Sequence, residues 1–596
     1  MARQRSLVKR LSSVETLGAT TVICTDKTGT LTQNRMAARF VWVSGQTVDV
    51  SGPSEETSAD LRELFAAGAL ASQAAEDHGD PTEMAIVGAA ANAGLDPDKL
   101  RREHDLLTPY PFDSFRKRMT LVRAVDSGAA AYVKGAPRET LALCDSIRWQ
   151  GQTAPLGEER RRALLADHDR LAASGLRVLA VAVRPLTAEL LGASAAVIER
   201  HLTLVGLFAL WDPPRPEVKG AVALCQGAGI RVVMITGDYG LTAQAIARQV
   251  GLTVDKVISG AEVDRLAPDS LQRLVAEPGV LFARTSPAHK LAIVSALKAG
   301  GEVVAVTGDG VNDAPALKAA DIGVAMGQRG SEVAKEAAVM ILTDDNFASI
   351  VAAVRQGRAI YANMGKFVTY IFTHNFAELM AFLAFVVFRI PLPLTVMQVL
   401  AIDLATDVLP ALALGAEPPE PHVMEQPPRR HGARLLGARR LLHAYGFLGA
   451  VEAMCSLGAF FWTYWLAGWR PGAAMATGGP LYARATTMTL SAIVAAQVGN
   501  VFACRTERES VFRVGLFSNP RVLGGIAAEI GLLAALILVP PFPAVFNTAP
   551  LSFSEWGILV VLPPLMLLLE EARKWTVRRV TRWKRTSASP GAMARG

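Results

Sequence analysis

Cysteine is scarce in this chain of 596 residues, and internal repeats and low-complexity tracts are missing. The five cysteines lie far apart and lack the spacing of metal ligands, which excludes a cysteine-based metal site. They are interpreted as buried or free thiols in a reducing compartment. The first ten residues are basic, but no apolar core of adequate length follows them, so the sequence predicts no cleavable signal peptide.

Charge is also scarce, and it is unevenly distributed. Only 19% of the residues are charged, whereas 51% are hydrophobic. Residues 1–365 carry regularly spaced charges and alternate strand-like with helix-like patterns, while residues 366–571 contain long apolar runs. This separation predicts a membrane protein with a large soluble part.

A single carboxylate follows the first strong strand pattern of the chain. The apolar stretch 21–25 ends at Asp26, and the next residues are rich in Gly and Thr. A carboxylate at the C-terminal edge of a sheet, beside free backbone N–H groups, is placed to accept a phosphoryl group. The string Asp26–Thr32 resembles the phosphorylation motif of the P-type ATPases, which form an aspartyl phosphate from ATP. An ordinary N-capping turn is the alternative.

A second acidic motif follows the apolar strand 303–306 and is expected to reach the same sheet edge. Phosphoryl transfer needs Mg²⁺ to offset developing charge, and Mg²⁺ prefers hard oxygen ligands. The predicted Mg²⁺ ligands are Asp26, Asp309 and the backbone carbonyl of Thr28. Asn312 and Asp313 are expected to hold phosphoryl oxygens and a metal-bound water.

Two more turns lie between these motifs, at 236–238 after the strand 232–235 and at 285–290. Four strand-then-turn segments in this order resemble the haloacid-dehalogenase type of catalytic domain found in P-type pumps. The resemblance implies that Lys290 pairs with the aspartyl phosphate and that Thr236 bonds its oxygens. The predicted catalytic residues are Asp26, Lys27, Thr28, Thr236, Gly237, Asp238, Lys290, Asn312 and Asp313.

Residues from about 36 to 207 interrupt the catalytic sheet and resemble the nucleotide-binding domain of type II P-type ATPases. Adenine needs an aromatic face, and the triphosphate needs cations nearby. The predicted nucleotide site comprises Glu83, Phe112, Lys117, Lys134, Gly135 and Arg177. The alternatives are a core role for Phe112, a surface charge for Lys134 and a helix-face role for Glu83. Arg138 departs from the family pattern, which has an acidic residue there.

Six apolar spans are predicted, at 367–389, 394–415, 442–467, 486–504, 522–541 and 554–571. Arginines gather in both even-numbered connections and after the last span: Arg429, Arg430, Arg434, Arg439, Arg440, Arg505, Arg508, Arg513 and the stretch 573–585. By the positive-inside tendency, the soluble part and the C-terminus face the cytoplasm of a multi-pass cell-membrane protein. Arg470 and Arg484 in the third turn are exceptions.

Ionisable and polar groups inside the first two spans predict a hard-cation site. The predicted ligands are Asn375, Glu378, Asp403, Thr406 and Asp407, with Asn375 and Glu378 on one helix face and the other three on one face of the next span. Three carboxylates at mid-membrane would cost on the order of 8–10 kcal/mol, so a scaffold without a use for them would not keep them. Pro410 lacks an N–H, which frees the carbonyl of Thr406 as a further ligand.

These two spans resemble the fifth and sixth spans of the calcium and sodium/potassium pumps. Calcium is the first choice of cargo, with manganese, sodium and protons also open. Gln497 and Asn500 match polar positions of a later span, where helix–helix hydrogen bonding is the alternative to ion contact.

The predicted fold is an α/β haloacid-dehalogenase-like phosphorylation domain with an inserted α+β nucleotide-binding domain, followed by an all-α membrane domain of six helices. The predicted boundaries are 1–35 and 208–345 for the phosphorylation domain, 36–207 for the nucleotide-binding domain, 346–366 for a stalk, 367–571 for the membrane domain and 572–596 for a basic cytoplasmic tail.

The leading hypothesis is ATP-driven cation transport with Mg²⁺, ATP, a transported cation and the lipid bilayer as partners, and no nucleic acid. Only 25 residues precede Asp26, and no Thr-Gly-Glu string occurs in the chain. The family places an actuator domain and four spans before its aspartate, so a partner chain or an extended chain is expected to supply them. The alternatives are a non-transporting ATP-binding or regulatory membrane protein and a membrane-anchored phosphatase.

Overall fold

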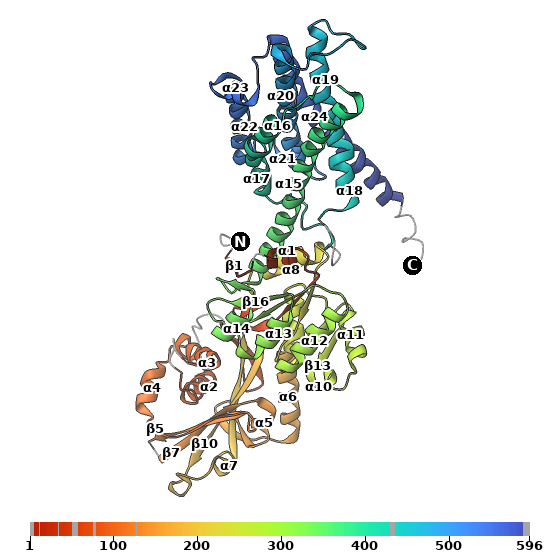
Figure 1. Cartoon of the computed structure of the whole chain (residues 1–596). Helices are drawn as coiled ribbons and strands as arrows, with labels where there is room; N and C mark the ends of the chain where they lie inside the picture. The colour runs from red at the N-terminus through yellow and green to blue at the C-terminus, as the bar shows by residue number, and fades with distance from the viewer. Residues whose placement is uncertain are drawn as a thin grey trace. The chain divides into compact units, whose positions relative to one another are not determined.

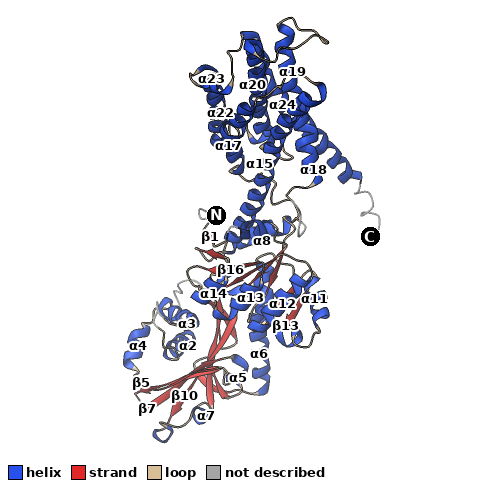
Figure 2. Ribbon diagram, in the orientation of Figure 1, coloured by secondary structure: helices blue, strands red, loops and turns tan. Residues whose placement is uncertain are grey.

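The computed structural model describes residues 5–10, 12–33, 35–50, 58–74, 79–126, 128–429 and 435–587 (Figure 1). The chain forms two compact units. The first contains the chain up to Ala353 apart from Val14–Ala19, and the second contains Val14–Ala19 and the chain from Val354. Figure 2 shows that the strands of the described part belong to the first unit and that the second is helical.

A six-stranded sheet organises the catalytic part of the first unit. Its strands, in spatial order, are β1 (Ser6–Val8), β17 (Met340–Leu342), β16 (Ile322–Met326), β15 (Val304–Gly308), β2 (Val22–Thr25) and β12 (Arg231–Met234). All neighbours are parallel except β1 and β17. The carboxyl ends of β2, β12 and β15 therefore meet at one edge, which is the edge that the sequence predicts for phosphoryl chemistry.

Helices pack around this sheet. Its central strands are continuous apolar runs, which is typical of a parallel sheet that is buried on both faces. The surrounding elements are α8 (Val218–Gly227), α9 (Gly240–Gln249), β13 (Lys256–Ser259), α10 (Gly260–Val263), α11 (Pro268–Ala276), β14 (Val280–Ala283), α12 (Pro287–Ala299), α13 (Ala314–Ala319) and α14 (Glu332–Ala337). Val22, Phe282 and Ile293 are fully buried in their shared core. Ser286 caps α12 by accepting a hydrogen bond from the N–H of His289.

A nine-stranded, mostly antiparallel sheet forms the rest of the first unit. Seven strands run in the order β4 (Gln46–Asp49), β3 (Ala37–Val43), β11 (Leu202–Trp211), β10 (Arg177–Leu186), β7 (Gly128–Gly135), β6 (Arg118–Val125) and β5 (Leu106–Asp113), and β8 (Cys144–Trp149) and β9 (Gln152–Pro155) branch from β11. Its helices are α2 (Ala59–Leu70), α3 (Pro81–Asn92), α4 (Pro97–Glu103), α5 (Pro137–Leu141), α6 (Glu158–Ala173) and α7 (Ala195–Ile198). The last strand, β11, continues past residue 207, the boundary expected from the sequence.

The chain passes between the two sheets twice, and the buried side chain of Asp212 joins the two connecting segments. The hydroxyl of Thr32 donates to the Oδ2 atom of Asp212 at 2.6 Å, and the other oxygen of Asp212 accepts from the N–H of Arg35 at 3.2 Å. Thr32 also forms an isolated antiparallel bridge with Pro214. The outgoing and returning segments are therefore fixed to each other at the point where the inserted domain begins and ends.

Six helices of the second unit are long and apolar enough to cross a membrane, as the sequence predicts. They span Phe347–Phe388, Val396–Gly415, Ala438–Leu466, Gly479–Cys504, Pro520–Leu538 and Phe553–Val580. In Figure 1 they are α15, α16 with α17 (Val396–Ala401 and Val408–Gly415), α18 with α19 (Ala438–Leu441 and Ala450–Leu466), α20, α22 and α24 (Phe553–Ser587). Shorter helices are α1 (Ser12–Gly18), α21 (Val511–Val514) and α23 (Phe542–Phe546).

Several predicted limits of the spans need correction. The predicted stalk and first span are one continuous helix, α15, which contains no proline. The fourth span begins at Gly479 rather than at 486. The predicted tail starts as the continuation of α24 up to Ser587. Arg430, Arg434 and residues 588–596 lie outside the described residues, and so do the side chains of residues 581–587.

Among the described residues, five arginines that entered the orientation argument have carboxylate partners: Arg440, Arg484, Arg505, Arg513 and Arg573. Arg484, one of the exceptions, forms an ion pair with Glu555 at 2.8 Å, so its charge is compensated within the unit. Arg505 is fully buried and binds Glu417 at 2.7 Å. Asn519 donates to the other oxygen of the same carboxylate at 2.6 Å. Arg505 therefore fastens two connections together and is not a free cytoplasmic charge.

Candidate functional site

Asp26 lies directly after β2, at the edge where the parallel strands end. Its backbone N–H donates to the hydroxyl of Thr307 at 3.2 Å, and its Oδ1 atom accepts from the N–H of Lys27 at 2.6 Å. The side chain is 22% exposed. One carboxylate oxygen is thus fixed by the backbone, and the group remains accessible to a ligand.

Lys290 joins two carboxylates at this edge. Its ammonium lies 2.6 Å from Oδ2 of Asp26 and 2.8 Å from Oδ1 of Asp313. Burial alone would lower the pKa of Lys290, but the two carboxylates raise it above the ordinary value. The lysine is therefore a permanent cation between the two acids, as the resemblance implies for a group that pairs with a phosphorylated aspartate.

The loop after β15 is shaped by Asp313. The second carboxylate oxygen of Asp313 accepts from the N–H groups of Asp309 and Gly310 at 3.2 and 3.1 Å. A Cβ atom at Gly308 would lie 2.4 Å from the Cβ of Asp313, so only glycine fits there. The buried Asp313 therefore holds Asp309 at the sheet edge.

Asp309 lies in a partly buried, negatively charged environment. Burial, followed by the negative charges of Asp26 and Asp313, raises the pKa of Asp309. Among the described residues, no group of three or more His, Cys, Asp or Glu side chains is arranged to hold a metal. A site with two carboxylates fits Mg²⁺ nevertheless, because Mg²⁺ commonly binds one or two carboxylates together with phosphate oxygens and water. The acidic groups at this edge therefore fit Mg²⁺.

The other predicted catalytic residues surround this edge in different environments. Thr236 is buried at the end of β12, and its hydroxyl accepts from the N–H of Asp238 at 3.3 Å. Lys27 is buried and forms an ion pair with Asp238. Thr28 and Asn312 are exposed. The structure thus brings all four predicted turns together, with two of their polar side chains open to a ligand.

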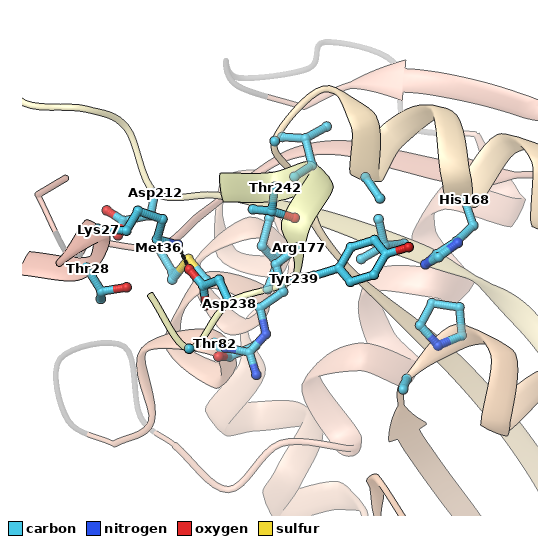
Figure 3. A pocket seen from close by; sticks show the side chains of 18 of the residues that line it. Lys27, Thr28, Met36, Thr82, His168, Arg177, Asp212, Asp238, Tyr239 and Thr242 are labelled. Carbon is cyan, nitrogen blue, oxygen red and sulfur yellow. Dashed lines mark ion pairs between the residues drawn. The ribbon is translucent and has the colours of Figure 1, made fainter. Parts of the chain in front are cut away.

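A cavity of about 740 Å³ adjoins these residues within the first unit (Figure 3). Its lining includes Lys27, Thr28, Gly237 and Asp238 from the catalytic turns and Lys117 and Arg177 from the inserted domain. The close-up shows Arg177 near Asp238 and Thr82, with Tyr239 between Thr242 and His168. Predicted catalytic and nucleotide residues therefore line the same cavity.

Glu83 and Lys134 lie in the interior of the inserted domain and are not part of that lining. The Lys134 ammonium lies 2.6 Å from Oε1 of Glu83 and donates to the carbonyl of Ala71 at 2.9 Å. The other oxygen of Glu83 accepts from the N–H groups of Gln73 and Ala74 at 2.9 and 2.8 Å. Burial lowers the pKa of Lys134. The predicted cation is thus fully engaged by protein groups.

Phe112 lies on β5 and Gly135 on β7 of the same sheet, with β6 between these two strands. Phe112 is 65% exposed on β5, so its ring is open to stacking and is not a core residue. A Cβ at Gly135 would lie 2.4 Å from the Cβ of Arg118 across the β6–β7 pair, so glycine is required by close packing. Lys117 forms a salt bridge with Glu139 at 2.5 Å.

Several residues of the cavity had no prediction from the sequence. Arg284 lies 4.9 Å from the ring centre of Tyr239 in a cation–π contact, and both line the cavity. Arg138, the departure from the family pattern, pairs with Asp169 on α6 at 2.8 Å. Arg284 directly precedes the motif 285–290, and this position next to a recognised turn is the sequence signal that could have identified it as a site residue.

The predicted ion ligands separate into buried and surface side chains. Glu378, Thr406 and Asp407 are buried, whereas Asn375 and Asp403 lie on the surface of the second unit. The sequence placed Asp403, Thr406 and Asp407 on one face, and the structure corrects this. Residues Ile402–Thr406 form a π-helical turn, whose wider hydrogen-bond pattern changes the angle between side chains three apart. Asn375 and Glu378 also differ in burial, because α15 presents only part of that face to its neighbours.

Asp407 is the centre of a buried polar cluster in this unit. His374 Nε2 lies 2.5 Å from its Oδ2 atom, and Gln497 Nε2 donates to its Oδ1 atom at 2.6 Å. Helix–helix hydrogen bonding, the alternative weighed for Gln497, is therefore present. Asn500 is buried on the same helix, and its Oδ1 atom accepts from the Cys504 thiol at 3.4 Å.

The buried ionisable residues of the spans that escaped the sequence analysis include His374, Glu452 and Glu529. The carboxylate oxygens of Glu452 and Glu529 have no hydrogen-bond partner among the described residues. Both lie within predicted spans, so the rule that selected Glu378 would have found them.

Comparison with known families identifies three regions of the chain. Residues 63–217 match the model of the P-type ATPase cytoplasmic domain N, and residues 391–576 match that of the cation transporting ATPase C-terminus. Residues 290–354 match the haloacid dehalogenase-like hydrolases. The fold prediction is therefore confirmed for all three parts.

Full-length relatives extend this agreement over nearly the whole chain. A calcium-transporting ATPase of Bacillus subtilis is 37% identical over 94% of this chain and 64% of its own length. A probable cation-transporting ATPase F of Mycobacterium tuberculosis is 37% identical over 93% and 63%. The sodium/potassium-transporting ATPase subunit alpha-2 of Gallus gallus is 34% identical over 97% and 65%. The chain thus spans slightly less than two thirds of these relatives, and it contains the cytoplasmic and C-terminal membrane domains of the P-type cation-transporting ATPase family.

Proposed function

We propose that this chain carries out the phosphoryl-transfer and ion-binding parts of ATP-driven cation transport, with Asp26 as the phosphoryl acceptor. The observation that carries the proposal is the placement of Lys290 within 2.6 Å of Asp26, at an edge where Asp309 and Asp313 add two further carboxylates. A lone nucleophilic carboxylate beside a fixed cation is suited to accept a phosphoryl group from a nucleotide.

The chain's own groups account for most of the proposed step. The Asp26 carboxylate attacks the γ-phosphorus, and the bond from phosphorus to the leaving oxygen of ADP breaks. Lys290 offsets charge on the phosphoryl oxygens, and Thr236, Gly237 and Asn312 offer hydrogen bonds to them. Mg²⁺, held by Asp26, Asp309 and the carbonyl of Thr28, would neutralise part of the phosphate charge.

The domain boundaries of the proposal are those expected from the sequence. We assign residues 1–35 and 208–345 to phosphorylation, 36–207 to nucleotide binding, 346–366 to a stalk and 367–571 to the membrane domain. Phe112 would stack on adenine, and Lys117 and Arg177 would face the phosphates across the cavity that also contains Lys27 and Asp238. The Glu83–Lys134 pair supports the floor of the adenine region.

The cargo in this proposal is a cation, with calcium as the first choice. Buried carboxylates at Glu378 and Asp407, with Thr406 beside them, supply hard oxygen ligands, and Asn375 and Asp403 lie on the adjoining surface. One of the relatives compared is a calcium-transporting ATPase. An actuator domain and four further spans, on the same polypeptide or on a partner chain, complete the proposed transport cycle.

Labelling with γ-phosphate-labelled ATP and Mg²⁺ tests the proposal. The purified chain should retain the label after acid quenching and release it in hydroxylamine, because an acyl phosphate is stable in acid and attacked by that nucleophile. The label should respond to the cargo ion when a complete membrane domain is present. A protein that binds ATP but never acquires label would support the regulatory alternative, and hydrolysis of simple phosphate monoesters would support the phosphatase.

A further inference from the structure

A basic cavity of about 590 Å³ lies in the second unit, at the cytoplasmic ends of α15, α18, α20 and α24. Its lining contains six permanent cations: Lys366, Arg429, Arg439, Arg440, Arg508 and Arg573. Only two carboxylates, Glu507 and Glu570, belong to the same lining. The cavity therefore has a large excess of positive charge.

Glu507, Glu570 and the neighbouring Glu420 neutralise only part of this positive charge. Arg440 pairs with Glu507 at 2.8 Å, and Arg573 pairs with Glu570 at 2.6 Å. Lys366 pairs with Glu420, just outside the lining, at 2.9 Å. The remaining cations are Arg429, Arg439 and Arg508, and none of them has a carboxylate partner in the part of the chain that the structure describes.

One of these three guanidinium groups is held in place before any ligand arrives. Arg429 lies over the ring of Tyr361, 3.1 Å from its centre, and donates to the carbonyl of Glu15 at 3.3 Å. Neither contact removes its positive charge. A planar, positioned guanidinium is suited to a phosphate group, which it can bind through two parallel hydrogen bonds.

Part of the remaining wall is apolar. Leu435, Cys504 and Val577 line the cavity beside the cations, and α15, α20 and α24 are helices long and apolar enough to cross a bilayer. Basic pockets between membrane helices on the cytoplasmic side match the headgroups of anionic lipids. We propose that this cavity binds the phosphate headgroup of an anionic phospholipid, with its acyl chains along the apolar wall.

This assignment is separate from the proposed phosphorylation and cargo sites, because none of their residues lines the cavity. Free phosphate esters share the headgroup chemistry, but they gain nothing from the apolar wall. The bound state should therefore require both the negative phosphate and the acyl chains.

Native mass spectrometry of the purified full chain in detergent tests the proposal. The chain is titrated with phosphatidylglycerol and with phosphatidylcholine of the same acyl composition. We expect preferential binding of phosphatidylglycerol, weakened about tenfold or more in the double variant Arg439→Gln/Arg508→Gln. The matched control is Arg513→Gln, an exposed arginine of the α20–α22 connection that does not line the cavity.

Two further measurements make the outcome decisive. The variant Arg439→Lys/Arg508→Lys keeps the charges and should regain most of the binding, which separates a loss of charge from a loss of folding. Competition with sn-glycerol 3-phosphate should be weak. Equal binding of the two lipids, unchanged binding in the Gln variant, or competition by glycerol phosphate with lipid-like affinity would each overturn the proposal.

Discussion

The ammonium of Lys290 lies 2.6 Å from Oδ2 of Asp26, although 264 residues separate them in the sequence. This contact places the Asp26 carboxylate beside a permanent cation. The same lysine reaches Asp313 at 2.8 Å, so it also fixes the loop that carries Asp309. A nucleophile, its counter-charge and a metal-binding loop are thus linked by one side chain.

The first prediction concerns the nucleophile. Asp26→Asn should abolish the acid-stable, hydroxylamine-labile label from ATP, because an amide cannot accept the phosphoryl group. Asp269→Asn, an exposed position in the first turn of α11, is the control and should keep the label. Undiminished labelling of Asp26→Asn, measured on acid gels, would remove Asp26 from the mechanism.

The second prediction concerns Mg²⁺ and pH. Burial and the charges of Asp26 and Asp313 raise the pKa of Asp309. At pH values just above the ordinary aspartate pKa, Asp309 is still protonated in the folded protein but already ionised in the unfolded chain. The free energy of unfolding without metal therefore falls as pH rises through this interval. Mg²⁺ binds the carboxylate form and offsets this loss.

The melting temperature should therefore rise more on adding Mg²⁺ at about pH 7.5 than at about pH 4.5. Asp309→Asn should remove most of this pH-dependent gain, whereas Asp269→Asn should preserve it. An equal Mg²⁺ response at both pH values in the parent protein would contradict the assignment of Asp309 as a ligand.

The third prediction concerns adenine. Phe112→Ala should weaken ATP binding by about 1–3 kcal/mol, the range found for stacking of a base on an aromatic ring. Because Phe112 is 65% exposed, its loss should leave the fold intact. Phe115 is 94% exposed on the same hairpin and provides the matched control. Calorimetric titration that gives the same ATP affinity for Phe112→Ala and Phe115→Ala would place the base elsewhere.

The fourth prediction concerns the buried Glu83–Lys134 pair. Glu83→Gln leaves the Lys134 ammonium buried without its counter-charge and should destabilise the inserted domain by about 3–5 kcal/mol. Removing both charges in Glu83→Gln/Lys134→Met should cost less than the sum of the two single changes. Denaturant unfolding of the four proteins measures this coupling, and additive losses would show that the pair contributes little.

The sequence predicts the catalytic edge well because the rule involved is local. Each of the strands β2, β12 and β15 is a short apolar run followed by polar residues, and parallel strands bring such ends together. The recognised motifs then supply Lys290. The same reasoning misses pairings that depend on packing between distant elements, such as Glu83 with Lys134 or His374 with Asp407.

The ion site shows a different limit of sequence patterns. Helical spacing predicts one face for Asp403, Thr406 and Asp407, but the backbone adopts a π-helical turn there. Hydrogen-bond register inside a helix is set by packing against neighbours and leaves no mark on hydrophobic periodicity. Burial of Glu452 and Glu529, by contrast, was open to prediction from charge within an apolar span.

The last prediction concerns Asp407 as a cargo ligand. Its carboxylate accepts from Gln497 of α20 and lies 2.5 Å from His374 of α15, so it is linked to two neighbouring helices. Asp407→Asn keeps the shape but removes the charge, and it should weaken activation of phosphorylation by the cargo ion in a preparation that contains a complete membrane domain. Glu425→Gln, an exposed carboxylate in the connection after α17, is the control. Labelling is measured across a concentration series of Ca²⁺ for each protein. An unchanged Ca²⁺ response in Asp407→Asn, and in a triple variant that also neutralises Glu378 and Asp403, would mean that these acids serve the structure of the unit and that the cargo binds elsewhere.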